Sequence, residues 1–228
     1  MGAPAISRIV GGMKLIPNCI RFFLLLLFIV AATGSVVQAK PKAKSKPKAK
    51  VELETVAAPE PGVRDITMRH IDHKKDRKAA KRIHYFKARL PVEVRDRNNF
   101  AWAKADIRGL PKKEYYAHSR VQSLSNYSSR VRRRISGISP KPPQETAQFE
   151  TLFVDFKGNI GGPNAIPRYY DTEYKIIEDI AARLTNTATA GSIQLYTDLI
   201  PCRSCRGVMR QFLAIYTNIE IEVLYDWP

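Results

Sequence analysis

The chain has 228 residues, enough for one domain with a hydrophobic core plus extensions. Its 38 lysines and arginines outnumber 21 aspartates and glutamates, which gives a formal net charge of +17. Such a charge indicates a polyanionic partner, either nucleic acid or an anionic membrane. The alternative is that the basic residues only make a tail soluble. The 3 cysteines include no second closely spaced pair, which argues against a zinc knuckle with four ligands.

Residues 1–39 read as a signal peptide. Lys14 and Arg21 precede the apolar run "FFLLLLFIVAATG", and "SVVQA" then offers a small-residue cleavage site after Ala39. The run is short for a spanning helix, so cleavage is favoured over an uncleaved anchor. We therefore expect a secreted protein with no stable membrane insertion after cleavage, which keeps Cys202 and Cys205 but loses Cys19.

A basic arm should follow the signal peptide. Residues 40–65 contain "KPKAKSKPKAK" and are expected to be a disordered Lys/Pro-rich linker, because the segment is highly charged and has few apolar residues. Residues 66–97 are expected to be a basic helical segment. In it, His70 and His73 could share a helix face as a metal pair, but a solvated charged face is the favoured interpretation.

Residues 98–228 alternate strand and helix patterns and are expected to form the functional domain. Strand patterns occur in "NFAWAKADI", "ETLFVDFKG", "GSIQLYTDLI" and "NIEIEVLYDW"; helix patterns occur in "DTEYKIIEDIAARL" and "CRSCRGVMRQFLAIY". The order β, β, α, β, α, β favours an α/β fold with a partly parallel sheet. Such connections place both helix starts near the carboxyl ends of neighbouring strands, where ligands bind.

Cys202 and Cys205 stand at the start of the last predicted helix, in "PCRSC". A thioredoxin-like redox pair would need several more elements than the few residues that follow Cys205. A disulfide across two intervening residues closes a very small loop and stabilises little. A metal site needs a third ligand and an acid–base group, and "DTE", residues 171–173, opens the other predicted helix.

The pair "DTE" and "PCRSC" has the form of a zinc site with an acid–base residue next to it. Two thiolates and Asp171 could hold zinc with a fourth position open for water, while Glu173 accepts and returns a proton. Nucleobase deaminases combine H-x-E with P-C-x-x-C in the same order. The alternative is ordinary helix capping, with Asp171 as the N-cap residue and Glu173 in the first turn.

Residues 98–228 resemble the nucleic acid/nucleotide deaminase superfamily, most of all the deaminase domains of bacterial polymorphic toxins. The similar stretches are "NFAWAKADIRGLP", "AHSR", "RYYDTEYKIIEDIAARL", "GSIQLYTDLIPCRSCRGVMRQF" and "NIEIEV". The resemblance implies a cytidine-deaminase-like mixed sheet flanked by helices, zinc on Cys202 and Cys205, and Glu173 as the proton shuttle. It also implies hydrolytic deamination of a nucleobase, with cytosine as the expected base, and a cognate immunity protein as partner.

One position departs from the superfamily pattern. Asp171 stands where most members have His or Cys; a carboxylate can also bind zinc, and toxin-type relatives favour Asp171 as the third ligand. His118 is the competing ligand, although a core or substrate-contacting role is favoured for it. Asn99, His118 and Ser119 are expected to line the substrate pocket.

The favoured interpretation is a secreted zinc-dependent deaminase toxin or effector that acts on nucleic acid or a nucleotide. Its site of action is expected to include the inside of a target cell. Basic residues 40–134 would then attract nucleic acid without sequence preference. Two alternatives stay open: a catalytically inactive deaminase fold that binds nucleic acid, and a secreted Cys-x-x-Cys thiol oxidoreductase. Because oxidising compartments favour disulfides, activity is expected only after entry into a reducing cytosol.

Overall fold

The structure is a computed structural model, and it describes residues 64–227. The predicted signal peptide, residues 1–39, lies outside the described residues, as does nearly all of the predicted linker, residues 40–65. Between residues 64 and 227 no helix has both the length and the apolar character needed to cross a membrane.

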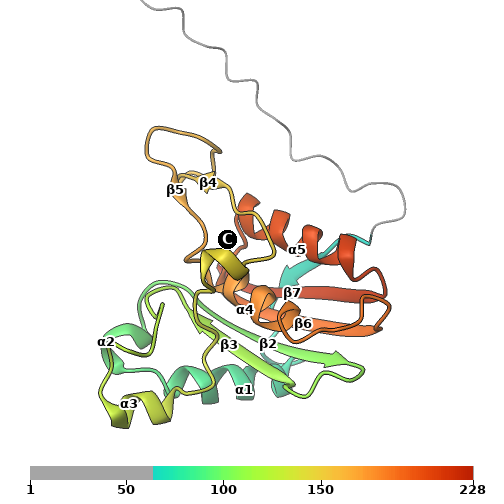
Figure 1. Ribbon diagram of the computed structural model, residues 1–228. Helices are drawn as coiled ribbons and strands as arrows, with labels where there is room; N and C mark the ends of the chain where they lie inside the picture. The colour runs from blue at the N-terminus through green and yellow to red at the C-terminus, as the bar shows by residue number, and fades with distance from the viewer. Residues whose placement is uncertain (1–63, 228) are drawn as a thin grey trace, which may run out of the picture. The chain divides into compact units, whose positions relative to one another are not determined.

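The described residues form a mixed α/β domain (Figure 1). Its strands are β1 (Thr67–His70), β2 (Phe100–Ile107), β3 (Glu114–His118), β4 (Phe153–Val154), β5 (Ile166–Pro167), β6 (Gly191–Leu199) and β7 (Ile219–Trp227). Its helices are α1 (Arg77–Ala88), α2 (Val92–Arg95), α3 (Ser129–Arg134), the single 3-10 turn η1 (Gln144–Thr146), α4 (Thr172–Ala181) and α5 (Arg203–Ile215).

The main sheet has the order β1-β7-β6-β2-β3, and β4 pairs with β5 apart from it. β1 and β6 run parallel to β7, whereas β2 runs antiparallel to both β6 and β3. The predicted α/β class, with a mixed sheet flanked by helices, is therefore confirmed.

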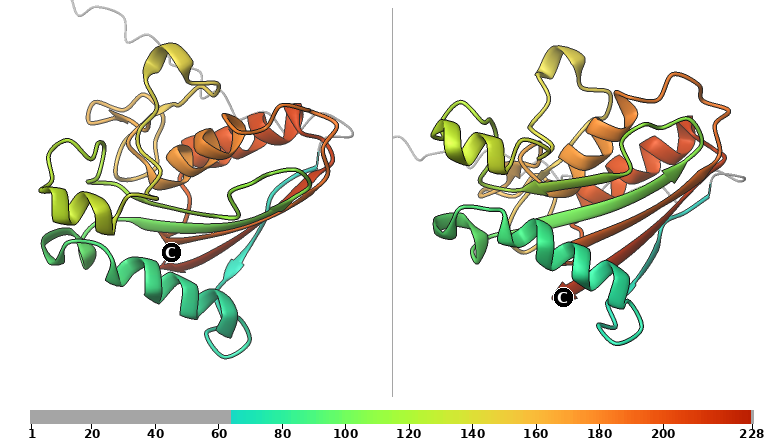
Figure 2. Two further views of the ribbon diagram at one scale, coloured as in Figure 1. Left: turned by 60° about the horizontal axis from the view of Figure 1, so that its bottom comes forward. Right: turned by 90° about the horizontal axis from the view of Figure 1, so that it is seen from below.

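Helices cover both faces of the sheet (Figure 2). Successive side chains of a strand point to opposite faces, so Ala103 and Leu195 join the core formed with α4 and α5. Their neighbours Trp102 and Tyr196 join a second core that includes Ile83 of α1. This two-sided burial explains why β2 and β6 are more apolar than strands with one solvent face.

The β6-α5-β7 connection sets the position of the last helix. β6 and β7 are parallel neighbours, so α5 must cross over the sheet to join them, and it begins just after the carboxyl end of β6. α4 packs against α5 on the same face. The N-termini of α4 and α5 are thus held by the same packed layer.

The segment at residues 66–90 differs from the helix expected there. Thr67–His70 is strand β1, because it pairs in parallel with β7 and Met68 packs against the core, and the helix begins only at Arg77. His70 stacks on Tyr225 with ring centroids 4.3 Å apart, and His73 lies 3.5 Å from Asp226. The two histidines therefore do not share a helix face.

The strand expected across "ETLFVDFKG" was also mostly wrong. Only Phe153–Val154 is a strand, and it pairs with Ile166–Pro167 outside the main sheet. Phe153 is 56% exposed, so its alternation with Val154 does not reflect burial in a sheet. The edge of the main sheet is formed instead by β3, whose five residues are too short to give a clear alternating pattern.

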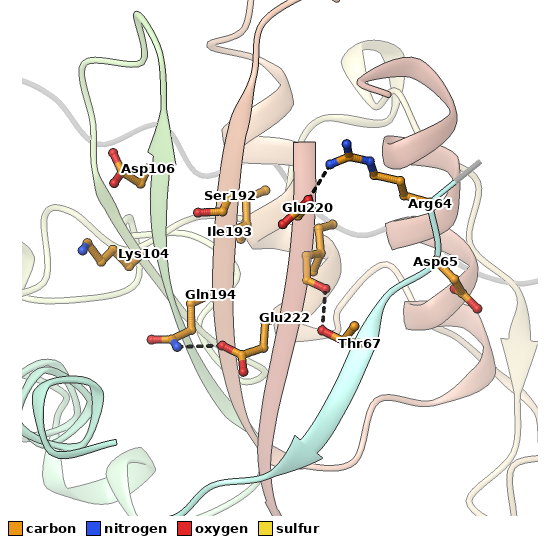
Figure 3. A pocket seen from close by; sticks show the side chains of 11 residues that line it. Arg64, Asp65, Thr67, Lys104, Asp106, Ser192, Ile193, Gln194, Glu220 and Glu222 are labelled. Atoms are coloured by element: carbon orange, nitrogen blue, oxygen red, sulfur yellow. Dashed lines mark hydrogen bonds and ion pairs between the residues drawn. The ribbon is translucent and has the colours of Figure 1, made fainter. Parts of the chain in front are cut away.

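The part of the second face that α1 does not cover is polar. Figure 3 shows this open face, a cavity of about 940 Å³ over β2, β6 and β7. Glu220 pairs with Arg64 at 2.6 Å, and Glu222 accepts a hydrogen bond from Gln194 at 2.8 Å. The carboxylates of Glu220 and Glu222 thus both have partners on this face.

Two glycines offer a matched test of the sheet packing. A Cβ on Gly191 would overlap the carbonyl oxygen of Asp106 and lie 2.6 Å from Cα of Ile107, both in the backbone of the neighbouring strand β2. A Cβ on Gly207, inside α5, would meet nothing within 4 Å. We expect Gly191→Ala to lower the free energy of unfolding by about 1–3 kcal/mol or more, from overpacking, and Gly207→Ala to raise it by up to about 1 kcal/mol.

Urea denaturation of the two variants checks this expectation. Equal effects of the two substitutions would contradict the close approach of β6 and β2.

Candidate metal centre and active site

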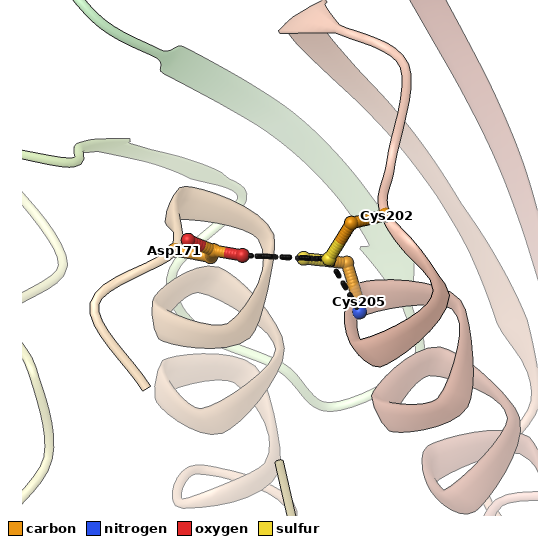
Figure 4. Close-up of side chains that lie close together, drawn as sticks. All are labelled: Asp171, Cys202 and Cys205. Carbon is orange, nitrogen blue, oxygen red and sulfur yellow. Dashed lines mark hydrogen bonds between the residues drawn. The ribbon is translucent and has the colours of Figure 1, made fainter. Parts of the chain in front are cut away.

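The N-termini of α4 and α5 bring Asp171, Cys202 and Cys205 together (Figure 4). Asp171 is the N-cap residue of α4 in an extended conformation, yet its side chain makes no capping hydrogen bond. Cys202 is the N-cap residue of α5, and its sulfur accepts a hydrogen bond from the N–H of Cys205. Since its carboxylate does not cap the helix, Asp171 is available to the two thiols.

The three side chains have the spacing of a tetrahedral zinc site. The two sulfurs lie 3.4 Å apart, and Oδ2 of Asp171 lies 3.5 Å from Sγ of Cys202 and 3.2 Å from Sγ of Cys205. Zn–S bonds of about 2.3 Å and a Zn–O bond of about 2.0 Å in tetrahedral geometry imply about 3.8 Å between sulfurs and about 3.5 Å from sulfur to oxygen. Both cysteines are free thiols, and this donor set fits zinc.

Glu173 is buried beside these ligand atoms. Its Oε1 accepts a hydrogen bond from Oγ1 of Thr197 at 2.9 Å, and its Oε2 accepts one from Oγ1 of Thr172 at 2.9 Å. Oε2 also lies 3.6 Å from Sγ of Cys205. The carboxylate is thus held in one orientation, directed at the metal centre.

Several acidic groups crowd into this buried space. Burial raises the pKa of the Asp171 carboxyl, and burial followed by the nearby charge of Asp171 raises the pKa of Glu173. The hydrogen bond between the sulfurs lowers the pKa of Cys202 and raises the pKa of Cys205, which burial raises further. A divalent cation would offset this concentration of negative charge.

Asn99 lies in the same cluster and connects the sheet to α4. Its side-chain nitrogen donates to Oγ1 of Thr172 at 2.8 Å and to Oγ1 of Thr197 at 3.0 Å. Its side-chain oxygen accepts from the backbone N–H of Leu199 at 3.2 Å. The amide is thereby saturated by the two threonines that hold Glu173.

His118 and Ser119 lie beside Asn99 but outside the group of ligand atoms. Nε2 of the buried His118 ring is 2.9 Å from the carbonyl oxygen of Arg97, and Nδ1 accepts from the N–H of Arg120 at 3.2 Å. Both ring nitrogens are therefore engaged, and burial lowers the pKa of the imidazole. Oγ of Ser119 accepts from the backbone N–H of Asn99 at 3.2 Å.

Three buried polar residues at the site were not singled out from the sequence: Thr172, Lys175 and Thr197. Lys175 donates from Nζ to the carbonyl oxygens of His118 at 2.7 Å and Val121 at 3.0 Å, which ties α4 to the loop after β3. Burial lowers the pKa of Lys175 to about 7. The one signal available in the sequence was Thr197, a polar residue on the otherwise apolar face of β6.

The chain was compared with known proteins. A comparison with curated proteins and one with solved structures found no match. One family model matches residues 83–227, more than half of the chain, and its description is Toxin-deaminase, the BURPS668_1122 family of deaminases. The matched range contains Asp171, Glu173 and both cysteines, and it confirms the resemblance to toxin deaminases. The chain therefore belongs to this family of toxin deaminases.

Proposed function

We propose that this protein is a secreted, zinc-dependent deaminase toxin that hydrolytically removes the amino group of a nucleobase. Cytosine, in nucleic acid or in a nucleotide, is the expected target. One observation supports this above all: Asp171, Cys202 and Cys205 place their ligand atoms within 4.8 Å of one another, and Glu173 adjoins them.

The residues divide the chemistry between them. Asp171 and the two thiolates would hold zinc, which supplies Lewis acidity and lowers the pKa of water toward neutrality. Glu173 would transfer one proton of the attacking water to the ring nitrogen and the second proton to the departing amine. Net hydrolysis exchanges the exocyclic amino group for a carbonyl oxygen and releases ammonia.

Asn99 is best assigned as a positioning residue for Glu173. Its amide contacts both threonines that hold the carboxylate, and Ser119 holds its backbone in turn. His118 supports the same loop through Arg97 and Arg120. Direct contacts of Asn99, His118 and Ser119 with substrate stay a prediction.

The biological setting follows from the family and from the predicted signal peptide. A toxin that leaves the producing cell would need a cognate immunity protein as partner. Cleavage after Ala39 and action inside a target cell are part of this proposal. The +17 formal charge of the full chain supports a polyanionic substrate.

Zinc content tests the metal centre. We expect one zinc per chain in the purified, reduced protein, because three ligands are already in place. Asp171→Ala should lose the metal during dialysis, while His118→Asn should keep it, since both His118 nitrogens bond to the backbone. Atomic absorption measures the ratio. If the Asp171→Ala variant keeps its zinc and the His118→Asn variant loses it, the third ligand is His118 and not Asp171.

Substitution of the proton shuttle tests the chemistry. Glu173→Gln keeps the size of the side chain but cannot accept a proton, so kcat for cytidine deamination should fall by roughly 10²–10⁴-fold with zinc retained. Glu93→Gln, which changes an exposed glutamate on α2, is the matched control. Full activity of Glu173→Gln would refute the assigned role.

Thiol oxidation tests the expected dependence on a reducing cytosol. The two sulfurs lie 3.4 Å apart, so in metal-free protein diamide should take up two electrons and two protons as Cys202 and Cys205 form a disulfide. Zinc should slow this reaction strongly, because it occupies both sulfurs. Titration of free thiols follows the loss, and Cys205→Ser controls for oxidation of Cys202 alone. Equal rates with and without zinc would contradict a shared zinc site.

A further inference from the structure

Two tyrosines directly precede the metal ligand Asp171. The rings of Tyr169 and Tyr170 lie 4.4 Å apart at a tilt of 54°, and Tyr170 is 41% exposed. Nζ of Lys141 lies 4.5 Å from the ring centre of Tyr169 and 5.3 Å from that of Tyr170. The two tyrosines lie in a turn that the N–H of Asp171 closes by donating to the carbonyl oxygen of Arg168 at 3.0 Å, so the aromatic pair lies within two residues of the proposed metal ligand.

A cavity of about 520 Å³ opens beside the aromatic pair. Tyr169, Tyr174, Phe149 and Phe153 supply aromatic side chains to its lining, and Lys141 lines it as well. Its volume lies in the range of small-molecule pockets, about 300–1,000 Å³. Phe149 and Tyr174 are nearly fully buried, so Tyr169 and the 56% exposed Phe153 are the aromatic side chains open to a ligand in a cavity that is large enough for a nucleobase.

Residues 147–151 of the cavity lining belong to a wall segment that is fixed to both α4 and α5. The carboxylate of Glu178, in α4, accepts the backbone N–H groups of Gln148 at 3.0 Å and Phe149 at 2.9 Å. From α5, the Gln211 side chain binds the backbone N–H and C=O of Glu150, each at 2.9 Å. These contacts give an irregular segment a defined position, so the cavity is formed before any ligand arrives.

The α5 contact continues next to the cysteines. Oγ of Ser204, which lies between Cys202 and Cys205 in the sequence, accepts the backbone N–H of Leu152 at 2.8 Å. The wall and the metal centre therefore share one rigid support.

Lys141 is free to meet an anion. Across residues 64–227 its ammonium takes part in neither a salt bridge nor a side-chain hydrogen bond; its contacts there are with the two tyrosine rings. Glu150 is the acidic residue of the cavity lining. A lysine over an aromatic surface, at the lining of this cavity, combines the two groups that bind single-stranded nucleic acid: a ring for the base and a cation for the phosphate.

We propose that the cavity, Tyr169, Tyr170 and Lys141 bind the nucleotide next to the target base in a single-stranded polynucleotide. The inference rests on the proposed function and extends it, because it makes a polynucleotide strand, rather than a free nucleoside, the preferred substrate. The neighbouring base stacks on the tyrosine rings, and the connecting phosphate meets Lys141. The site recognises the flat surface of a base and the charge of a phosphate, and DNA and RNA strands share both features.

Two measurements on the zinc-loaded protein test this site. The first is the ratio of kcat/KM for a trinucleotide with a central cytosine to kcat/KM for cytidine. The second is the Kd of a fluorescein-labelled trinucleotide by anisotropy, which needs no turnover. DNA and RNA trinucleotides form separate arms. The variants are Tyr169→Leu, which keeps apolar packing against the core, and Lys141→Gln, with Tyr85→Leu and Lys78→Gln on α1 as matched controls.

Loss of stacking in Tyr169→Leu should raise Kd roughly 5- to 150-fold and lower the kcat/KM ratio by a similar factor. Lys141→Gln should raise Kd and reduce the slope of log Kd against log salt by about one. Tyr85→Leu should leave both quantities unchanged, and Lys78→Gln, which removes one charge from the basic residues 40–134, should raise Kd less than Lys141→Gln and leave the kcat/KM ratio unchanged. Thermal unfolding of each variant separates loss of the site from loss of the fold.

The outcomes distinguish this inference from the proposed function. If wild type deaminates cytidine but neither variant changes the kcat/KM ratio or Kd, the second-nucleotide site is wrong and the deaminase stands. If wild type deaminates neither substrate, the proposed function fails. The trinucleotide Kd from anisotropy, which needs no turnover, then still shows whether the second-nucleotide site exists. Tight binding in one nucleic-acid arm alone identifies that strand as the ligand.

Discussion

The structure depends on the packing of α4 against α5 on one face of the sheet. This contact places Oδ2 of Asp171 3.5 Å and 3.2 Å from two sulfurs that lie more than thirty residues away in the chain. The parallel pairing of β6 with β7 enforces it, because α5 must cross the sheet between them. A helix start usually satisfies its own N–H groups with the N-cap side chain. Here Asp171 is directed away from that role and toward the thiols.

A buried polar network connects this helix contact to the carboxylate of Glu173. Thr172, Thr197 and Asn99 together satisfy the oxygens of Glu173, and each comes from a different element or its edge. Buried polar groups that lose a partner cost about 1–3 kcal/mol each, so this network restricts where α4 can lie over β2 and β6. The same groups therefore contribute to both the orientation of the carboxylate and the register of the layers.

The long segment between β3 and α4 shows how irregular chain can acquire a fixed position. Lys175 holds its beginning through the carbonyl oxygens of His118 and Val121, and Glu178 holds its middle at Gln148 and Phe149. Arg168 holds its end, donating to the carbonyl oxygens of Val154 and Asp155. Charged side chains from one helix and one loop thus take the place of a sheet partner, which explains why strand propensity in this segment had so little influence.

The sequence by itself determined the α/β class, the two helices that begin with "DTE" and "PCRSC", and the strands β2, β6 and β7, because their apolar periodicity and helix starts are local properties. It also predicted Asp171, Glu173, Cys202 and Cys205 as site residues, since metal-ligand types at helix starts stand out in a chain with few cysteines, and the structure places these four side chains close together. Only the tertiary structure decided that Thr67–His70 is a strand, that Phe153 lies outside the main sheet, and that both nitrogens of His118 are engaged by the backbone. Those outcomes depend on partners distant in the chain, and no periodicity within a segment encodes which partner it meets.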